Sequence, residues 1–313
     1  MKIVAVEPIG MNSSQIAGCN EKFTKLGHQF TCFTDRKEDS DTLKQRMHLA
    51  DVVIISNIKL DCDILSACPN LKLLAVAFTG IDHIDMEFCT AHGIEVVNAP
   101  GYAVTAVAEL VIGLAIDLQR KITELDAVTR RGGTRQIFLG KQLKDKRVGI
   151  IGTGNIGRKT AEYFQALGCE VVAYNRTLYE EVIKSGVQYL PLDELLSTSD
   201  IISLHLPYTT ETDNLISSEK LALCKPTTVI INAARGKLID YFALSQALRK
   251  GQIAGAALDV FETEPPLPES HPLFTAPNCI LTPHIGYATQ EAFALRIEIV
   301  IEKITKWICN KNL

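Results

Sequence analysis

The sequence predicts an α/β fold with two doubly wound units, each a parallel sheet covered by helices. Short apolar runs rich in β-branched residues alternate with amphipathic segments along nearly the whole chain, and this alternation starts again after residue 140. Strands of a parallel sheet are buried on both faces, so they appear as nearly continuous Val, Ile and Leu runs joined by helices. The 313 residues are many for one hydrophobic core but usual for two.

The first unit is predicted to begin with four strands. They are expected at residues 2–6, 50–56, 71–77 and 94–98. Helical periodicity covers residues 14–27, between the first two of these strands. A boundary is predicted at residues 98–101, because a strand exit followed by Pro-Gly forms a turn, and a long apolar helix should then cover residues 103–121.

The second unit is predicted to contain six strands. They are expected at residues 147–152, 170–174, 200–206, 228–234, 253–260 and 279–284. From about Tyr287 to the end the pattern is helical, with no strand after it. Because this helix must cover its apolar face, we expect it to return to the N-terminal unit. The predicted domains are therefore residues 1–99 with 286–313, and residues 100–285.

Composition and charge exclude several classes of function. A net charge of −4 provides no field for nucleic acid or for an anionic membrane. The nine cysteines are scattered and form no CxxC pair, so neither a metal site nor a disulfide framework is predicted, and a reducing cytoplasm is expected. The N-terminal ten residues resemble a strand rather than a signal peptide, and the most apolar stretch carries Glu109 and Asp117, so no membrane span is expected.

A glycine-rich turn after the strand at 147–152 predicts a dinucleotide site. It consists of Gly152, Thr153, Gly154, Asn155, Ile156 and Gly157, and it opens directly into a helical pattern. The first glycine permits the tight turn, the second lets the backbone approach a pyrophosphate, and the third allows the helix to pack on the strand. The helix N-terminus adds N–H donors and a partial positive charge for the phosphates.

The residues after the next strand bear on the choice of cofactor. An acidic residue there would bind the ribose hydroxyls of NAD, but this chain has Asn175, Arg176 and Thr177. Arg176 is suited to pair with a 2′-phosphate, which favours NADP over NAD. The alternatives are that Arg176 stacks on adenine or is solvated, and Glu180 and Glu181 weaken the positive field.

Three further motifs lie at the carboxyl ends of predicted strands, where open α/β sheets bind ligands. They are NAARG with Arg235, ALDVFETEPP with Asp259 and Glu264, and TPHIG with His284. Reduction of a 2-keto acid needs a proton donor, for which histidine is suited, and a carboxylate that stabilises its protonated form. It also needs an arginine to hold the substrate carboxylate and polarise the carbonyl. Each residue alone could be structural, but the combination predicts this chemistry.

With these motifs the chain resembles the D-isomer-specific 2-hydroxyacid dehydrogenases. The resemblance runs through LLAVAFTGIDHID (73–85), VAEL (107–110), the glycine turn, LHLPYTTET (204–212), NAARG, LDVFETEP and TPHIG. The order of Arg, Glu and His downstream of the glycine turn is more specific than any single motif. L-specific lactate and malate dehydrogenases carry the glycine motif near the N-terminus, unlike this chain.

The resemblance implies a Rossmann-type cofactor domain inserted in a flavodoxin-like substrate domain. It implies that Arg235 anchors the substrate, His284 is the acid/base, Glu264 is its partner and Asp259 contacts the nicotinamide carboxamide. Backbone amides at Phe78, Thr79 and Gly80 would hold the substrate carboxylate, and further cofactor contacts are expected at Leu206, Pro207, Thr212, Ala233 and Ala234. A homodimer is implied, with the helix after residue 101 at its interface.

Glyoxylate and hydroxypyruvate are the substrates expected first, because AVAFTGIDHID and PGYAVTAVAEL resemble glycerate-type members. Formate is not expected, since family formate dehydrogenases carry Gln in place of Glu264. Two alternatives stay open: an NAD-linked D-lactate-type dehydrogenase, and a non-catalytic dinucleotide sensor, against which the three catalytic residue types argue. Within ISNIKL (55–60), Asn57 and Lys59 either touch the substrate or form a solvated loop.

Overall fold

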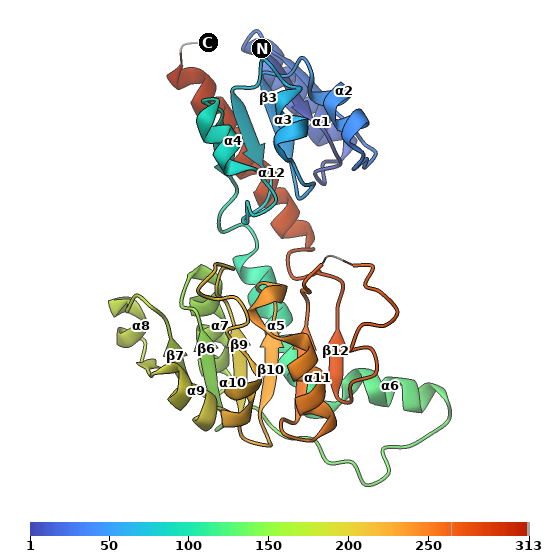
Figure 1. Ribbon diagram of the computed structural model, residues 1–313, viewed down its shortest axis with the longest axis vertical. Coiled ribbons are helices and arrows are strands. Elements are labelled where there is room, and N and C mark those ends of the chain that lie inside the picture. Colours follow the sequence, from blue (N-terminus) through green and yellow to red (C-terminus); the bar gives the residue numbers. More distant parts are fainter. Residues whose placement is uncertain (264, 312–313) are drawn as a thin grey trace. The chain divides into compact units, whose positions relative to one another are not determined.

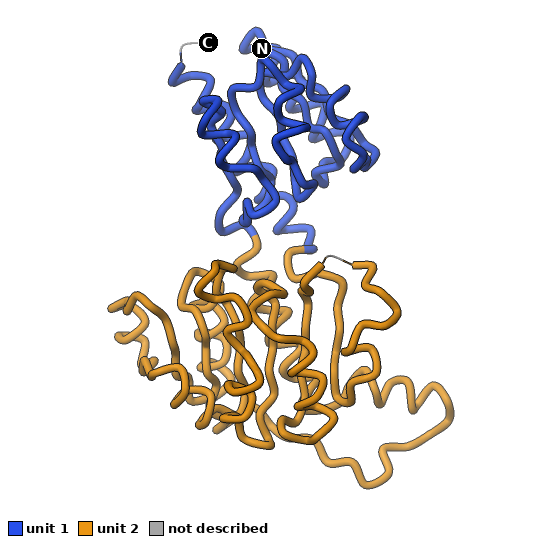
Figure 2. Tube along the Cα trace, viewed as in Figure 1, with its two compact units in different colours: residues 1–102, 288–313 blue, residues 103–287 orange. Residues whose placement is uncertain are grey.

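The computed structural model describes residues 1–263 and 265–311. The chain divides into two compact units, Met1–Tyr102 with Ala288–Leu313 (unit 1) and Ala103–Tyr287 (unit 2), coloured separately in Figure 2. The expected limits were 99 and 286, against 102 and 288 for these units.

Unit 1 is built on a five-stranded parallel sheet, in the part of the chain that the structure describes. Its strands are β1 (Lys2–Ala5), β2 (Gln29–Cys32), β3 (Val52–Ile55), β4 (Leu73–Val76) and β5 (Glu95–Asn98). They lie in the order β2-β1-β3-β4-β5, which is the flavodoxin-like order that the resemblance implied. Strand β2 was not predicted: it is an edge strand in which only Phe30 is buried, so it lacks the apolar run of a central strand.

Five helices of the described chain complete unit 1. They are α1 (Ser13–Lys25), α2 (Ser40–Met47), α3 (Cys62–Ser66), α4 (Met86–Ala91) and α12 (Gln290–Asn310). Asn12 begins α1 with a capping box, in which its side chain accepts from the backbone of Gln15 and the Gln15 side chain accepts from the backbone of Asn12. The C-terminal helix α12 packs on β4 and β5 and belongs to unit 1.

Unit 2 contains a seven-stranded parallel sheet, again counting the described residues. Its strands are β6 (Arg147–Ile151), β7 (Glu170–Tyr174), β8 (Gln188–Tyr189), β9 (Ile201–Leu204), β10 (Val229–Asn232), β11 (Gly255–Leu258) and β12 (Cys279–Leu281). The order is β12-β11-β10-β9-β6-β7-β8, the Rossmann order with one strand added beside β11. The fold class predicted from the sequence is therefore confirmed. Strand β8 was missed, because two residues carry no readable periodicity.

Helices cover both faces of this sheet. They are α5 (Val104–Arg120), α6 (Ile122–Arg130), α7 (Asn155–Ala166), α8 (Glu180–Lys184), α9 (Leu192–Thr198), α10 (Ser218–Leu223) and α11 (Tyr241–Arg249), with a 3-10 turn at Gly236–Leu238. Helices α5 and α7 pack together on one face, and α9, α10 and α11 lie on the other (Figure 1). Among the described residues, no helix combines the length and the hydropathy that crossing a membrane requires.

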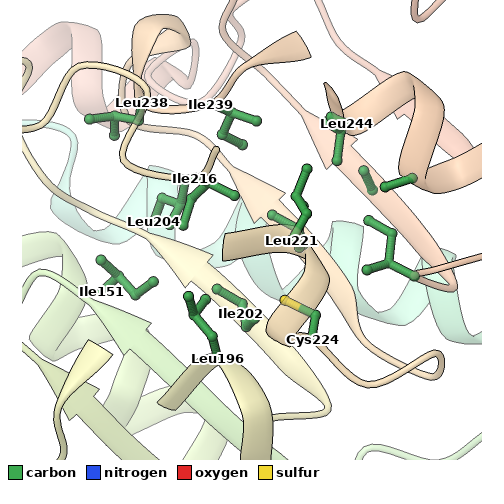
Figure 3. Close-up of a cluster of buried hydrophobic side chains, with 14 of the residues drawn as sticks. Ile151, Leu196, Ile202, Leu204, Ile216, Leu221, Cys224, Leu238, Ile239 and Leu244 are labelled. Atoms are coloured by element: carbon green, nitrogen blue, oxygen red, sulfur yellow. The ribbon is translucent and has the colours of Figure 1, made fainter. Parts of the chain in front are cut away.

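A cluster of buried aliphatic side chains joins the sheet of unit 2 to the α9–α11 layer (Figure 3). Ile202 and Leu204 from β9 meet Leu221 of α10 and Leu244 of α11, and all four are fully or almost fully buried. Burial of one such side chain contributes roughly 1.5–3 kcal/mol. This packing fixes the carboxyl ends of the strands, from which the candidate site residues follow.

Candidate active site

The glycine turn between β6 and α7 has the shape of a phosphate cradle. Gly152 adopts φ +100°, and a Cβ there would lie 2.8 Å from the backbone carbonyl carbon of His205. A Cβ on Gly157 would lie 1.9 Å from the carbonyl oxygen of Gly152. At Gly154 a Cβ would meet no described atom within 4 Å, so this backbone faces open space. Two glycines are thus required by packing inside the turn, and the third leaves room for a ligand.

The start of α7 supplies donors for that space. Gly154 is the N-cap of the helix and, among the described residues, no side chain caps this end. The first N–H groups of a helix lack partners within the helix, and they bind phosphate oxygens well. The residues therefore fit the pyrophosphate of a dinucleotide, which would lie between these N–H groups and Gly154.

Asn175 and Tyr189 connect the turn, through hydrogen bonds, to the chain that follows β7 and to β8. Asn175, directly after β7, accepts a hydrogen bond from the Thr153 backbone N–H (3.3 Å) and donates to the Thr177 carbonyl (2.6 Å). The Thr153 hydroxyl lies 2.8 Å from the Tyr189 hydroxyl, on β8. Tyr189 was not identified from the sequence, because the two residues of β8 carry no readable pattern.

Arg176 lies on the surface beside this turn. Its Nη1 donates to Glu211 Oε2 at 3.0 Å, and the two side chains are 87% and 73% exposed. The neighbouring acids Glu180 and Glu181 form ion pairs with Lys184 and Arg158, respectively. They therefore have cationic partners of their own, which reduces their effect on the positive field at Arg176.

The loop after β9 passes close to the glycine turn. The backbone nitrogen of Leu206 lies 3.0 Å from the position of a Cβ on Gly152. The Thr212 hydroxyl donates to the Pro207 carbonyl at 2.9 Å, which closes the loop of residues 207–212 on itself. Leu206, Pro207 and Thr212, all expected to contact the cofactor, thus belong to one compact loop beside the cradle.

Asn232 organises the turn that carries Arg235. Its fully buried side chain donates to the Arg235 carbonyl (2.9 Å) and accepts from the Ala234 N–H (3.0 Å), which shapes the chain through Ala233. A Cβ on Gly236 would lie 1.9 Å from the carbonyl oxygen of Phe261, so only glycine permits this close approach. The Arg235 turn therefore packs on the segment that leads to Glu264, which itself lies outside the described residues.

Asp259 holds the loop of residues 282–286, which we call the His284 loop. The carboxylate is 1% exposed; Oδ1 accepts from the Thr282 hydroxyl (2.6 Å) and the Ile285 N–H (2.8 Å), and Oδ2 accepts from the Gly286 N–H (2.7 Å). His284 lies between these donors with φ +55°. From the sequence, Asp259 was expected to contact the cofactor; its support of this loop was not predicted, since its partners lie 23 to 27 residues away.

His205 is excluded as the proton donor by its environment. Its ring nitrogen Nε2 lies 2.8 Å from the Ser203 hydroxyl. Desolvation lowers the pKa of His205 to about 3, so its imidazole is neutral at physiological pH. His284 is then the histidine of unit 2 that follows a strand end and suits acid/base chemistry.

In unit 1, Phe78, Thr79 and Gly80 follow β4. The Asn98 side chain donates to the Thr79 carbonyl at 2.7 Å, and the Ala99 N–H donates to the Phe78 carbonyl at 3.0 Å. The ends of β4 and β5 are thereby joined, and the shape of the 78–80 turn is fixed.

A buried ionic cluster lies at the end of β1 and β3 in unit 1. Glu7, which is 0% exposed, accepts from the Ser56 N–H at 2.7 Å and pairs with Arg36, which also donates to the Asn57 side chain at 2.9 Å. Arg296 of α12 donates to the Ser56 hydroxyl at 3.2 Å. Burial raises the pKa of Glu7, against the lowering effect of the Ser56 N–H and Arg36.

This cluster fixes the start of the loop that follows β3, residues 56–58, because Ser56 bonds to Glu7 and Arg296 and the Asn57 side chain accepts from Arg36. The loop lies where the strand order of the sheet reverses, a usual place for ligands. Glu7 and Arg36 were not identified from the sequence. The available signal was an acidic residue immediately after a buried strand.

Arg235, Asp259 and His284 follow β10, β11 and β12, which are adjacent in the sheet. The glycine turn and Asn175 follow β6 and β7 at the same edge. A dinucleotide cradle therefore shares its sheet edge with an arginine and a histidine, a combination that suits an α/β oxidoreductase. A family model for the NAD binding domain of D-isomer specific 2-hydroxyacid dehydrogenases matches residues 112–286.

Similarity to individual proteins supports the assignment to the same family. A glyoxylate reductase of Thermofilum pendens is 42% identical over 241 residues, which are 75% of this chain and 71% of that protein. The solved structure of an acyclic imino acid reductase with NADPH and D-Arg has a TM-score of 0.88 and 30% identity, with 99% and 98% of the chains covered. For the D-lactate dehydrogenase of Aquifex aeolicus with NAD and lactic acid, the TM-score is 0.85, the identity 30% and the coverage 99% and 96%.

The chain therefore belongs to the family of D-isomer-specific 2-hydroxyacid dehydrogenases, as the sequence motifs indicated. It is an oxidoreductase that interconverts a 2-keto acid and a D-2-hydroxy acid with a nicotinamide cofactor.

Proposed function

We propose that the chain reduces glyoxylate or hydroxypyruvate, and that Arg235, Glu264 and His284 are its catalytic residues. The observation that carries this proposal is the single sheet edge of unit 2, where the glycine cradle, Arg235 and the His284 loop emerge together. The similarity to a glyoxylate reductase supports the choice of substrate. When bound, the dinucleotide supplies the hydride that the keto carbon accepts.

The residues then have distinct tasks. The Arg235 guanidinium pairs with the substrate carboxylate and polarises the keto group. His284 donates a proton to the keto oxygen as that oxygen gains charge, and Glu264 stabilises the protonated imidazole. The backbone amides of Phe78, Thr79 and Gly80 bind the substrate carboxylate in this proposal. Asp259 keeps His284 in place through the donors of its loop and contacts the nicotinamide carboxamide.

We further propose NADP(H) as the preferred cofactor. The support is the exposed guanidinium of Arg176 beside the cradle, with an amide, Asn175, where NAD-binding proteins carry an acid. The solved structure of an acyclic imino acid reductase, which has a similar fold, is a complex with NADPH. In this proposal Asn155, Ile156 and Thr177 line the same cradle, and Ala233 and Ala234 face the nicotinamide end.

The test is a panel of glyoxylate, hydroxypyruvate and pyruvate, each assayed with NADPH and with NADH. We expect kcat/KM for glyoxylate and hydroxypyruvate to exceed that for pyruvate by about tenfold or more, the scale on which a pocket discriminates small groups. Chiral analysis should identify the product from hydroxypyruvate as D-glycerate. An L product would contradict the assignment.

A D-lactate-type activity is the second candidate. It is favoured by the similarity to the D-lactate dehydrogenase of Aquifex aeolicus. In that case pyruvate with NADH would give the highest kcat/KM of the panel, and the same assay decides between the two.

We also propose that the chain acts as a cytoplasmic homodimer. Helix α6 has no buried residue within the described chain, and Figure 1 shows it extending from the sheet with the segment after it. Ile137 and Leu139 of that segment are 93% and 81% exposed, next to a cavity of about 480 Å³ lined by Leu118, Phe138 and Leu139. Sedimentation velocity should show a dimer that the double substitution Ile137→Asp, Leu139→Asp converts to a monomer.

The cytoplasmic location is supported by the cysteines. Nine free thiols suit a reducing compartment.

A further inference from the structure

Two exposed loops flank the glycine turn of unit 2. Residues 175–177 follow β7 and residues 207–212 follow β9, and these two strands lie on either side of β6. We call them the cofactor loops. The order of strands reverses between β6 and β9, which is where doubly wound sheets bind dinucleotides. The ion pair between Arg176 and Glu211 joins the two cofactor loops beside the carboxyl end of β6, which lies between β7 and β9.

The charges around Arg176 single out Glu211. Glu180 pairs with Lys184 and Glu181 pairs with Arg158, so each of these acids forms an ion pair with a cation other than Arg176. Glu211 pairs with Arg176 itself, through one guanidinium nitrogen, Nη1, and one carboxylate oxygen. A 2′-phosphate is a stronger partner for Arg176 than this carboxylate, because it carries more charge and can accept two parallel bonds where Glu211 accepts one.

We propose that Glu211 moderates the discrimination between NADPH and NADH by competing with the 2′-phosphate for Arg176. This inference rests on the proposed use of NADP(H). When NADH binds, Glu211 neutralises Arg176, so no unpaired charge remains beside the ribose. When NADPH binds, the 2′-phosphate takes Arg176, and Glu211 loses its partner and lies close to a second negative group.

The competition is mild, because both side chains are largely exposed and water screens their charges. Glu211 therefore moderates the preference for NADPH rather than abolishing it. Removal of its charge should increase the affinity for NADPH and leave that for NADH nearly unchanged.

The experiment is a direct titration of the full-length protein with NADPH and NADH, followed by cofactor fluorescence or calorimetry in the absence of substrate. Glu211→Gln keeps the size of the side chain and removes its charge. We expect about threefold tighter binding of NADPH and less than about 1.5-fold change for NADH at low salt, the scale of an exposed ion pair. Glu180→Gln, which removes the same charge from a residue paired with Lys184, is the matched control and should change neither affinity.

Two smaller probes isolate the adenosine end of the site. Adenosine 2′,5′-bisphosphate should bind about threefold more tightly to Glu211→Gln, and 5′-AMP should not distinguish it from the natural chain. The contrast should shrink as the salt concentration is raised to 0.5 M, because the charges are screened.

A third variant, Arg176→Ala, distinguishes failure of the proposed competition from failure of the NADP(H) proposal. If Arg176→Ala weakens NADPH selectively but Glu211→Gln leaves the NADPH/NADH ratio unchanged, the competition is refuted and the NADP(H) proposal stands. An equal gain for both cofactors in Glu211→Gln, or the same gain in Glu180→Gln, also refutes it. If Arg176→Ala does not alter the ratio, both proposals fall.

Discussion

The His284 loop and the cofactor loops leave the same sheet edge of unit 2, but they are fixed in opposite ways. The His284 loop is held by Asp259, a buried carboxylate that accepts three hydrogen bonds. The cofactor loops are joined by one ion pair between exposed side chains, Arg176 and Glu211. A buried group left without its partner costs about 1–3 kcal/mol, whereas an exposed ion pair contributes about 0–1 kcal/mol.

The difference separates two requirements of the proposed reaction. A proton donor must stay within hydrogen-bonding reach of the keto oxygen, and a displacement of about 1 Å can cost about a hundredfold in rate. Recognition of the cofactor's outer ribose needs only a modest bias between two dinucleotides. Unit 1 repeats the first arrangement, since the buried carboxylate of Glu7 binds the Ser56 N–H directly and Arg36, which in turn binds Asn57.

The largest effect should follow substitution of His284 itself. His284→Ala should lower kcat by about a hundredfold or more, the contribution of a general acid. Because His284 has φ +55°, alanine would also strain the backbone, so His284→Asn is the matched variant, since asparagine tolerates this region. Steady-state kinetics should show the same loss in both variants. Near-normal turnover in His284→Asn would refute the role of the imidazole.

Asp259→Asn tests whether the buried carboxylate is needed to hold the His284 loop. Asparagine retains one acceptor oxygen, but its amide group would face an N–H donor of the His284 loop, so the loop should move. We expect kcat to fall about 10- to 100-fold. Thr282→Val removes only the hydroxyl bond to Asp259 and should have a smaller effect. If Asp259→Asn retained full turnover, the three bonds would not be needed to position His284.

Glu7→Ala examines the corresponding arrangement in unit 1. The substitution leaves the Ser56 N–H without its acceptor and Arg36 without its buried partner. We expect a loss of about 1–3 kcal/mol in the free energy of unfolding, measured in urea. Arg36→Ala should cost less, because that side chain is partly exposed. Equal stability of the natural chain and Glu7→Ala would mean that desolvation cancels the bonds.

The pH dependence of stability isolates the charge of Glu7. Its pKa is raised in the folded state, so the folded chain binds this proton more tightly than the unfolded chain. Stability from Glu7 is therefore fully present below its ordinary pKa and is lost as the pH rises through the raised value. Relative to Glu7→Gln, the natural chain should lose stability as the pH rises above 4.5, the ordinary pKa of a glutamate. A constant difference across this range would contradict the raised pKa.

The sequence predicted the parts of the fold and site that depend on neighbouring residues. Central strands such as β6 and β9 are continuous apolar runs, and the glycine turn lies within six positions, so both could be recognised locally. The edge strand β2 was missed, because one buried residue gives no run. The motifs around Arg235 and His284 were also local, and the structure places them after β10 and β12, the strands on either side of β11.

What could not be predicted depends on residues far apart in the chain. Asp259 and its partners are separated by 23 to 27 positions, Glu7 and Ser56 by 49, and Ser56 and Arg296 by 240. No periodicity or spacing links such pairs, since only the fold brings them together. The pairing of Arg176 with Glu211, 35 positions away, was hidden for the same reason.

Asn175→Asp tests the exposed cofactor loops and has a smaller expected effect. A carboxylate there suits ribose hydroxyls and repels a 2′-phosphate, so NADPH should bind about fivefold more weakly, while NADH should change less than about twofold. The substitution also loses the donor to the Thr177 carbonyl, so Asn175→Ser, which is uncharged, serves as the control for this structural cost. Direct titration should show selective weakening only in Asn175→Asp. Equal weakening of both cofactors would mean that Asn175 acts by shaping the turn through Thr153, and that the adjustable discrimination lies with Arg176 and Glu211 alone.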